Sequence, residues 1–208
     1  MIKEFETEKD FKKFFNQKKQ IKIGFGGEGV CYLGKDDLIY KRIESYLCSG
    51  KRDIDKIITE DDYDLEHFAF PIDIYTNPNH RKLYGYNTKL FREDILQPLG
   101  LIYRINPEKM VKAFYDLLED VRVVSNDKWF LFDSINNLLY NNKSFMLIDT
   151  LDYYKMDKNT LDENIAILLK AIEIPIYMHT KNDKFCDESS IEEIASNVKK
   201  YVKEKKYY

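Results

Sequence analysis

The residues with the clearest chemical signature in this sequence are glycines. The chain has eight glycines in 208 residues, and four of them lie within six positions: Gly24, Gly26, Gly27 and Gly29. They match the spacing Gly-x-Gly-x-x-Gly, which is typical of loops whose bare backbone approaches the phosphates of a nucleotide. A glycine-rich hairpin turn that binds nothing is the competing interpretation.

The residues around the glycines distinguish between two kinds of nucleotide site. Ile21, Ile23 and Phe25 alternate with polar or glycine positions, and Val30–Leu33 follows the loop, so we expect a strand on each side. A dinucleotide-binding fold would instead need the glycines to open a helix. A strand–loop–strand hairpin is the form in which a glycine-rich lid covers the phosphates of ATP.

A lysine follows on the next predicted strand. Lys41 ends the apolar run Leu38–Tyr40, where its ammonium group could reach the α- and β-phosphates of a nucleotide. Any exposed strand end can also carry a lysine, so this residue supports the nucleotide interpretation only together with the glycines.

Asp133, Asn137 and Asp149 form the strongest pattern. Asp133 and Asn137 precede the short apolar run Leu138–Tyr140, and Asp149 comes directly after a second run, Phe145–Ile148. The turn between the runs predicts a hairpin, which would bring three oxygen ligands to one end. Carboxylate and amide oxygens suit Mg²⁺ that bridges ATP phosphates. The alternative is that Asp133 and Asn137 only cap turns.

In their order from about Ile21 to Ala171, these motifs resemble the protein-kinase-like superfamily. The likeness is to small, divergent bacterial proteins of the protein kinase family with a reduced C-terminal lobe. It implies that the chain binds ATP and Mg²⁺ and transfers the γ-phosphoryl group to a hydroxyl. The acceptor, a protein or a small molecule, is not identified by the sequence.

The resemblance also implies roles for individual residues. The four clustered glycines would cover the phosphates, Lys41 would pair with them, and Asp133 would accept the proton of the acceptor hydroxyl. Asn137 and Asp149 would hold Mg²⁺. The hinge between the lobes would be Thr88–Phe91, which would meet adenine through Lys89, Leu90 and Phe91.

The chain departs from the kinase pattern at the predicted catalytic loop. Asn137 follows Asp133 by four residues instead of five, and Leu131-Phe132 stands in place of His-Arg. This shortened loop supports an alternative function, a pseudokinase that senses a nucleotide or binds a protein partner. After Asp149 the sequence continues Thr-Leu instead of Phe-Gly, and Asp152 could supply a second carboxylate.

The acidic partner of Lys41 is ambiguous in the sequence. Its spacing from Lys41 favours Glu60, on a helix predicted over Asp53–Asp62, with Glu44 and Asp61 as alternatives. Glu60 therefore joins the predicted cofactor-binding residues.

Composition excludes several other classes of protein. With 33 Lys+Arg, 36 Asp+Glu and a net charge of -3, the chain lacks the basic excess of a nucleic-acid binder. Three cysteines and three histidines, widely spaced, disfavour a disulfide framework or a structural zinc site. The charged N-terminal residues and the absence of long apolar runs predict a cytoplasmic protein without a membrane segment.

The pattern of elements predicts an α+β fold, and the resemblance implies that this fold is bilobal and protein-kinase-like. Residues 1–90 would form an antiparallel sheet with one inserted helix, after a short amphipathic helix within Lys3–Lys19. Residues 91–208 would form a reduced, mostly helical lobe that carries the catalytic and metal-binding hairpin. Its helices would begin at Pro107, at a capping box Thr160–Glu163 and at a second box Ser189–Glu192, and the middle one would stop before Pro175.

Overall fold

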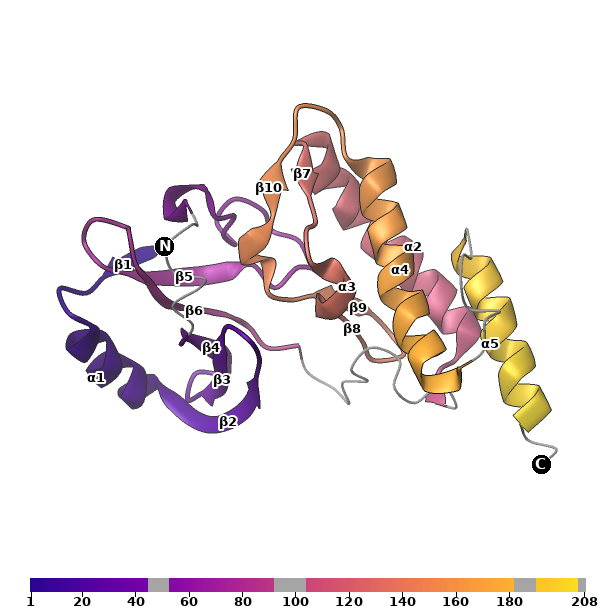
Figure 1. Ribbon diagram of the computed structural model, residues 1–208, viewed down its shortest axis with the longest axis horizontal. Coiled ribbons are helices and arrows are strands. Elements are labelled where there is room, and N and C mark those ends of the chain that lie inside the picture. Colours follow the sequence, from indigo (N-terminus) through magenta and orange to yellow (C-terminus); the bar gives the residue numbers. More distant parts are fainter. Residues whose placement is uncertain (45–52, 92–103, 182–189, 206–208) are drawn as a thin grey trace. The chain divides into compact units, whose positions relative to one another are not determined.

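The chain folds into α+β structure, as the sequence predicts (Figure 1). The structure is a computed structural model and describes residues 1–44, 53–91, 104–181 and 190–205. Two units can be separated. The first consists of Met1–Asp64, Ala69–Leu90 and Thr150–Asp152, and the second of Leu65–Phe68, Phe91–Asp149 and Tyr153–Tyr208.

The first unit is built on a six-stranded sheet with the strand order β1-β5-β6-β4-β3-β2. β1 pairs with β5 in parallel, and the other neighbouring pairs are antiparallel. The predicted meander β2–β3–β4 and the hairpin β5–β6 are confirmed, whereas the short β1 was not predicted. The strands are β1 (Ile2–Glu4), β2 (Lys19–Phe25), β3 (Gly29–Gly34), β4 (Leu38–Ile43), β5 (Pro71–Thr76) and β6 (Leu83–Lys89).

Helix α1 (Glu8–Lys18) covers one face of this sheet, which confirms the predicted amphipathic helix. It begins at Thr7, whose side-chain oxygen accepts a hydrogen bond from the backbone N–H of Asp10 at 3.2 Å. The apolar face of α1 meets aromatic side chains from three strands. The buried members of this cluster are Phe11, Phe15, Tyr40, Tyr75 and Tyr84.

The opposite face of the sheet has its own apolar cluster: Ile54, Ile57, Ile74, Leu83, Tyr86 and Leu151. A bulge makes this division possible. Tyr75 pairs with Gly85 and Thr76 with Leu83, so Tyr84 is an extra residue. Because the bulge shifts the alternation, Tyr84 and Tyr86 contribute to opposite faces.

The prediction of a helix over Asp53–Asp62 is wrong. Only the 3-10 turn η1 (Ile54–Lys56) forms, and residues Ile57–Thr59 after it are irregular. The isoleucines that suggest helical periodicity pack on the sheet instead, since Ile54 and Ile57 belong to the second cluster. Tertiary burial thus overrides the local pattern.

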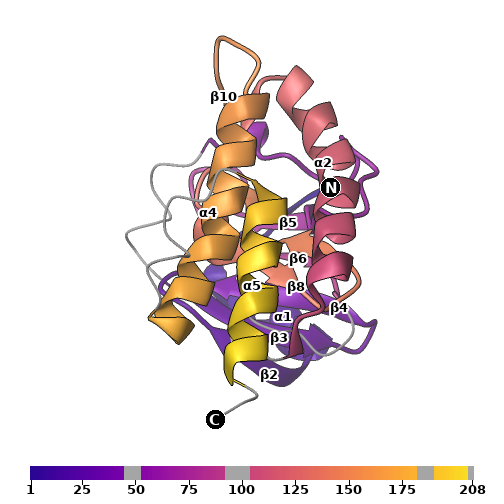
Figure 2. The ribbon, with the colours of Figure 1, turned by 90° about the vertical axis from the view of Figure 1, so that its right-hand side faces the viewer.

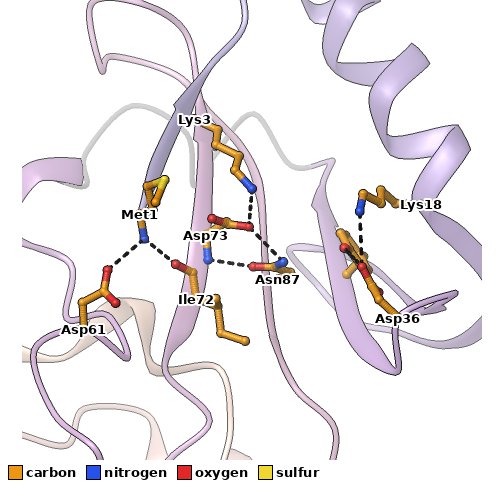
Figure 3. A network of polar contacts seen from close by, with 9 residues as sticks. Met1, Lys3, Lys18, Asp36, Asp61, Ile72, Asp73 and Asn87 are labelled. Carbon is orange, nitrogen blue, oxygen red and sulfur yellow. Dashed lines mark hydrogen bonds and ion pairs between the residues drawn. The ribbon is translucent and has the colours of Figure 1, made fainter.

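A polar network fixes β1 against the centre of the sheet (Figure 3). The Lys3 ammonium lies 2.6 Å from the Asp73 carboxylate on β5. The side chain of Asn87 on β6 accepts from the Asp73 backbone N–H at 2.7 Å and donates to the Asp73 carboxylate at 3.2 Å. Asp73 and Asn87 are buried, so these bonds satisfy groups that would otherwise destabilise the sheet.

The second unit contains three long helices, and α2 packs against both of the others (Figure 2). They are α2 (Pro107–Asn126), α4 (Leu161–Thr180) and α5 (Ile191–Lys205). The predicted start of α2 is confirmed, because the Asn106 side chain accepts from the backbone N–H groups of Glu108 and Lys109, each at 3.1 Å.

Two predictions about helix ends are wrong. The Thr160 hydroxyl does not cap α4 but donates to the backbone oxygen of Trp129 at 2.6 Å. Helix α4 also continues through Pro175 to Thr180. Ile172 and Ile176 are fully buried on either side of this proline, so packing outweighs the lost backbone hydrogen bond.

The start of α5 also differs from the prediction. The capping residue is Ser190 instead of the predicted Ser189, because the Ser190 hydroxyl oxygen accepts a hydrogen bond from the Glu193 N–H at 3.3 Å. Ser189 itself lies outside the described residues.

Among the residues that the structure describes, no helix has the length and apolar character needed to cross a membrane.

Short strands complete the second unit. β7 (Trp129–Phe130) pairs with β10 (Tyr154–Lys155), and β8 (Leu138–Tyr140) pairs with β9 (Phe145–Leu147) as the predicted hairpin. The one-turn helix α3 (Ser134–Asn137) leads into β8. Between β9 and β10 the chain enters the first unit as the 3-10 turn η4 (Thr150–Asp152).

Candidate functional site

The glycine cluster spans the turn between β2 and β3, with Gly24 in β2, Gly26 and Gly27 in the turn and Gly29 at the start of β3, which confirms the strand–loop–strand context. The Gly26 N–H donates to the Gly29 oxygen at 2.9 Å and closes the turn. The neighbouring Glu28 oxygen accepts from the N–H of Glu44, just beyond β4, at 2.8 Å. The loop is therefore tied to the third strand of the meander at its C-terminal end.

The glycines of this turn fall into two classes. A Cβ atom at Gly29 would overlap the backbone oxygen of Arg42, so packing within the protein requires glycine there. Gly24, Gly26 and Gly27 have no atom within 4 Å of where a Cβ would stand, and none of the described glycines has a positive φ. Gly24 lies at an irregularity in the register of β2 on β3, where glycine is common, whereas neither packing nor a positive φ accounts for Gly26 and Gly27.

Lys41 lies on the sheet face opposite α1. Its side chain is 8% exposed, and its ammonium lies 3.3 Å from the carboxylate of Glu28. The same ammonium stands over the ring of Tyr86, 5.7 Å from the ring centre. Lys41 is thus a largely buried cation that forms an ion pair with a carboxylate of the glycine turn.

The carboxylate that the structure pairs with Lys41 was missed in the sequence. Glu28 stands inside the glycine motif, whereas the spacing from Lys41 favoured Glu60 on a helix that does not form. Glu60 lies in a turn, where its N–H donates to the Pro71 oxygen at 2.9 Å, and its pairing with Lys41 stays a prediction. Of the alternatives, Glu44 forms an ion pair with Arg42, and Asp61 lies 3.5 Å from the terminal ammonium of Met1 (Figure 3).

The predicted hinge residues lie at the end of β6. Lys89 is the last residue of the strand and is opposite Leu38 in the register with β4. Leu90 and Phe91 follow, and all three side chains are half-buried. The structure describes nothing of residues 92–103.

In the second unit, Asp133 occupies a specialised backbone position. Its φ of 62° is left-handed, which is unusual for a residue other than glycine. Both carboxylate oxygens accept amide hydrogen bonds from α3: Asn136 donates to Oδ1 at 3.1 Å and Asn137 to Oδ2 at 3.3 Å. The carboxylate is therefore oriented while its residue stays exposed.

Asp149 comes to the same place through the hairpin. The backbone N–H of Ile148 donates to the backbone oxygen of Asn137 at 2.9 Å. This bond sets Asp149, the next residue, beside the end of α3. Asp149 is also left-handed, with a φ of 56°. Five other described non-glycine residues share this conformation, which aspartate adopts more readily than most residue types, so it fixes the local backbone without by itself assigning a role.

The buried phenol of Tyr153 lies near both carboxylates. Burial raises the pKa of Tyr153, and the negative charges of Asp149 and Asp133 raise it further, while a hydrogen bond with Ser134 lowers it. The Ser134 hydroxyl lies 3.3 Å from the Tyr153 hydroxyl. Asn137 thus contacts Asp133 directly and lies beside the position of Asp149 in the hairpin, while the roles of these three residues stay predictions.

Asn164 on α4 positions the Asp133 loop and was missed in the sequence. It is fully buried, and its side chain accepts from the Leu131 N–H at 3.0 Å. Its amide group donates to the Trp129 oxygen at 2.8 Å and to the Ser125 hydroxyl at 2.9 Å. The only signal in the sequence was an amide side chain on the apolar side of a predicted helix.

His67 and Asp120 anchor the other side of the hairpin. The ring nitrogen Nδ1 and the backbone N of His67 both lie 2.9 Å from Oδ2 of Asp120, and the His67 oxygen accepts from the Leu147 N–H at 2.8 Å. Burial would raise the pKa of Asp120, but the hydrogen bonds from His67 outweigh it and lower that pKa. This pair therefore holds the strand that leads to Asp149.

Exposed aromatic side chains adjoin Asp133. Phe132 and Tyr154 are each about half exposed, and their ring centres lie 6.1 Å apart. Phe130, paired with Tyr154 in the β7–β10 ribbon, lies 5.4 Å from the same ring. An apolar surface therefore borders the exposed carboxylate.

The donor set of the second unit fits a metal ion that arrives with phosphate. Among the described residues, no three His, Cys, Asp or Glu side chains are grouped so that they could hold a metal ion. Two carboxylates and the Asn137 amide are nevertheless the oxygen donors that Mg²⁺ uses when substrate phosphates complete its coordination. Mg²⁺ would thus depend on a nucleotide for tight binding.

No protein-family model matches this chain, and no curated protein matches it either.

Proposed function

We propose that this chain is a phosphotransferase of protein-kinase-like type, which binds ATP and Mg²⁺ and transfers the γ-phosphoryl group to a hydroxyl of a protein or small-molecule acceptor. The observation that carries the proposal is the group Asp133, Asn137 and Asp149, with its two left-handed aspartates. The glycine turn and the buried Lys41 of the first unit supply a second, separate feature of the same chemistry.

In this function the residues of the chain have distinct tasks. Lys41 and the backbone of the glycine turn would bind phosphate oxygens, and Asn137 and Asp149 would hold Mg²⁺, which offsets the phosphate charge. Asp133 would orient the acceptor hydroxyl and accept its proton. The bond from the acceptor oxygen to phosphorus forms as the bond to the departing ADP oxygen breaks, and the proton moves to the Asp133 carboxylate.

The geometry of Asp133 suits this task. A carboxylate that is held by two amide groups loses little freedom when it meets a hydroxyl, so the reacting groups are already oriented. Asp133 is the residue before α3 and Asn137 is the last residue of that single turn, and this spacing permits the direct contact between the two side chains.

A pseudokinase that only binds nucleotide is the second candidate. The observation that favours it is the engagement of Asp133 by both Asn136 and Asn137, which occupies the carboxylate that would act as the base. This candidate predicts nucleotide binding without turnover.

Thermal unfolding with and without MgATP tests the proposal. A ligand at 100 times its dissociation constant stabilises the folded protein by about 2.7 kcal/mol, on the order of 5 to 10 °C in midpoint for this size. We expect a shift that requires Mg²⁺, that is lost in Asp149→Asn and that is kept in the control Asp157→Asn, an exposed acid of the same unit. Absence of a shift with any nucleotide would contradict both candidates.

Detection of phosphoryl transfer separates the two candidates. ATP hydrolysis, in which water takes the place of the acceptor, should be measurable in the wild type and lost in Asp133→Asn with MgATP binding intact. Binding without hydrolysis in the wild type, even with a pool of candidate acceptors, would favour the pseudokinase. A Lys41→Ala variant with full ATP affinity and turnover would contradict the proposed phosphotransferase function.

A further inference from the structure

Glu28 is held at a fixed place within the glycine turn. Its backbone oxygen accepts from Glu44 at 2.8 Å, and the turn around it is closed by the bond from Gly26 to Gly29. Gly29 lies so close to the Arg42 oxygen that no side chain fits there. These contacts bring the turn onto β4 and let the Glu28 side chain reach Lys41.

The ion pair between Glu28 and Lys41 is partly shielded from water. The Glu28 carboxylate lies 3.3 Å from the Lys41 ammonium, and the two side chains are 23% and 8% exposed. Solvent screens shielded ion pairs less than pairs on the surface. The electrostatic attraction between Glu28 and Lys41 is therefore stronger than that of an exposed pair at the same distance.

A phosphate group on Lys41 would meet this carboxylate. The phosphate and the Glu28 carboxylate are both anions that bind the same ammonium group. A carboxylate that stayed beside bound phosphates would repel them. A nucleotide that uses Lys41 must therefore displace Glu28 or accept its repulsion.

We propose that Glu28 sets the affinity and the phosphate selectivity of the nucleotide site by competing with phosphate for Lys41. This inference rests on the proposed function, because it assumes that a nucleotide binds at the glycine turn. Ligands with several phosphates neutralised by Mg²⁺ displace the carboxylate, while ligands without phosphate gain nothing from its removal.

Calorimetric binding of Mg²⁺–ADP and of adenosine to the whole chain tests this inference. Glu28→Gln keeps the size of the side chain and removes its charge, and should tighten Mg²⁺–ADP binding by about three- to tenfold. Adenosine binding should be unchanged. The matched control is Glu44→Gln, which removes the same charge from the same end of the β3–β4 hairpin but pairs with Arg42, and should leave Mg²⁺–ADP binding within about twofold.

A double-mutant cycle attributes the gain to Lys41. In a Lys41→Met background, Glu28→Gln should no longer tighten Mg²⁺–ADP binding, because the shared cation is gone. Unchanged or weaker binding in Glu28→Gln, with the wild type binding normally, would overturn the inference and leave the proposed function standing. An equal gain in Glu44→Gln would overturn it as well.

The failure of the proposed function has a different signature. If neither the wild type nor Glu28→Gln binds Mg²⁺–ADP, the nucleotide site itself is refuted, and the role of Glu28 with it. If only Glu28→Gln binds, the carboxylate blocks the site and the inference is supported. Thermal unfolding of each variant without ligand confirms that all are folded.

Discussion

Asn137 lies one helical turn after Asp133, and its side-chain amide donates to both the backbone oxygen and the carboxylate of Asp133, at 3.1 and 3.3 Å. The amide N–H₂ group is thereby committed to Asp133. Within the described part of the chain, no hydrogen bond reaches the side-chain oxygen of Asn137. One asparagine can therefore orient the proposed base with its nitrogen and meet a cation with its oxygen.

This relationship predicts different effects for two neighbouring asparagines. Asn137→Ala should lower Mg²⁺-dependent ATP hydrolysis on the order of 100-fold, because it removes a metal ligand and a contact to Asp133. Asn136→Ala removes only an exposed contact to Asp133 and should cost less than about fivefold. Hydrolysis rates over a Mg²⁺ titration measure both effects, and equal losses in the two variants would contradict the assignment of Asn137.

The buried Asn164 predicts a large effect on stability. Asn164→Ala would leave the Leu131 N–H and the Trp129 oxygen without their buried partner, at a cost of about 3 kcal/mol in the free energy of unfolding. Asn159→Ala, an exposed change two residues before α4, should cost less than about 1 kcal/mol. Urea unfolding compares the two variants, and a similar small cost for both would show that Asn164 does not hold the Asp133 loop.

The local parts of this site could be predicted from the sequence. The two apolar runs around a polar turn define the β8–β9 hairpin, and the hairpin alone sets Asn137 beside Asp149. The alternation around the glycines likewise predicts β2 and β3. In each case residues that are close in the sequence determine the geometry, so pattern and structure agree.

The parts that depend on distant contacts could not be predicted. Glu28 and Lys41 are only 13 residues apart and the hairpin between them was predicted, but their pairing depends on how the glycine turn lies on β4, which the alternation of apolar residues does not reveal. Ile54 and Ile57 have helical spacing, but the sheet face they cover prevents a helix. The kinase-like arrangement of two lobes stays a prediction, since each unit is defined by its own contacts.

A histidine at the β5–β6 turn predicts a pH dependence of stability. His80 lies 2.6 Å from the Asp55 carboxylate and 2.9 Å from that of Glu4, and hydrogen bonds to Asp55 and then Glu4 raise its pKa. A raised pKa means that the charged form stabilises the folded state. This contribution is complete below the pKa of the unfolded chain, about 6.5, and is lost as the pH rises through the higher folded value.

His80→Asn tests this dependence, because asparagine tolerates the left-handed backbone of residue 80, with its φ of 53°. The difference in urea midpoint between wild type and variant should be largest near pH 6 and should shrink towards pH 9. A difference that does not change across this range would contradict the ion pairs as its source.

The two classes of glycine in the β2–β3 turn predict opposite outcomes for the same substitution. Gly29→Ala should destabilise the protein by about 2 kcal/mol or more, because its Cβ would overlap the Arg42 backbone oxygen, which cannot move without disturbing β4. Gly27→Ala meets open space at a φ that alanine can adopt, and should be neutral or stabilise the chain by about 0.5 kcal/mol. If a nucleotide approaches this turn, Gly27→Ala should nevertheless weaken Mg²⁺–ADP binding by about tenfold, because the added methyl group would occupy space the ligand needs.

Unfolding and calorimetry on the two variants separate a glycine needed for folding from one needed for binding. A Gly27→Ala variant with unchanged affinity for Mg²⁺–ADP would show that the glycine turn is not part of the proposed nucleotide site.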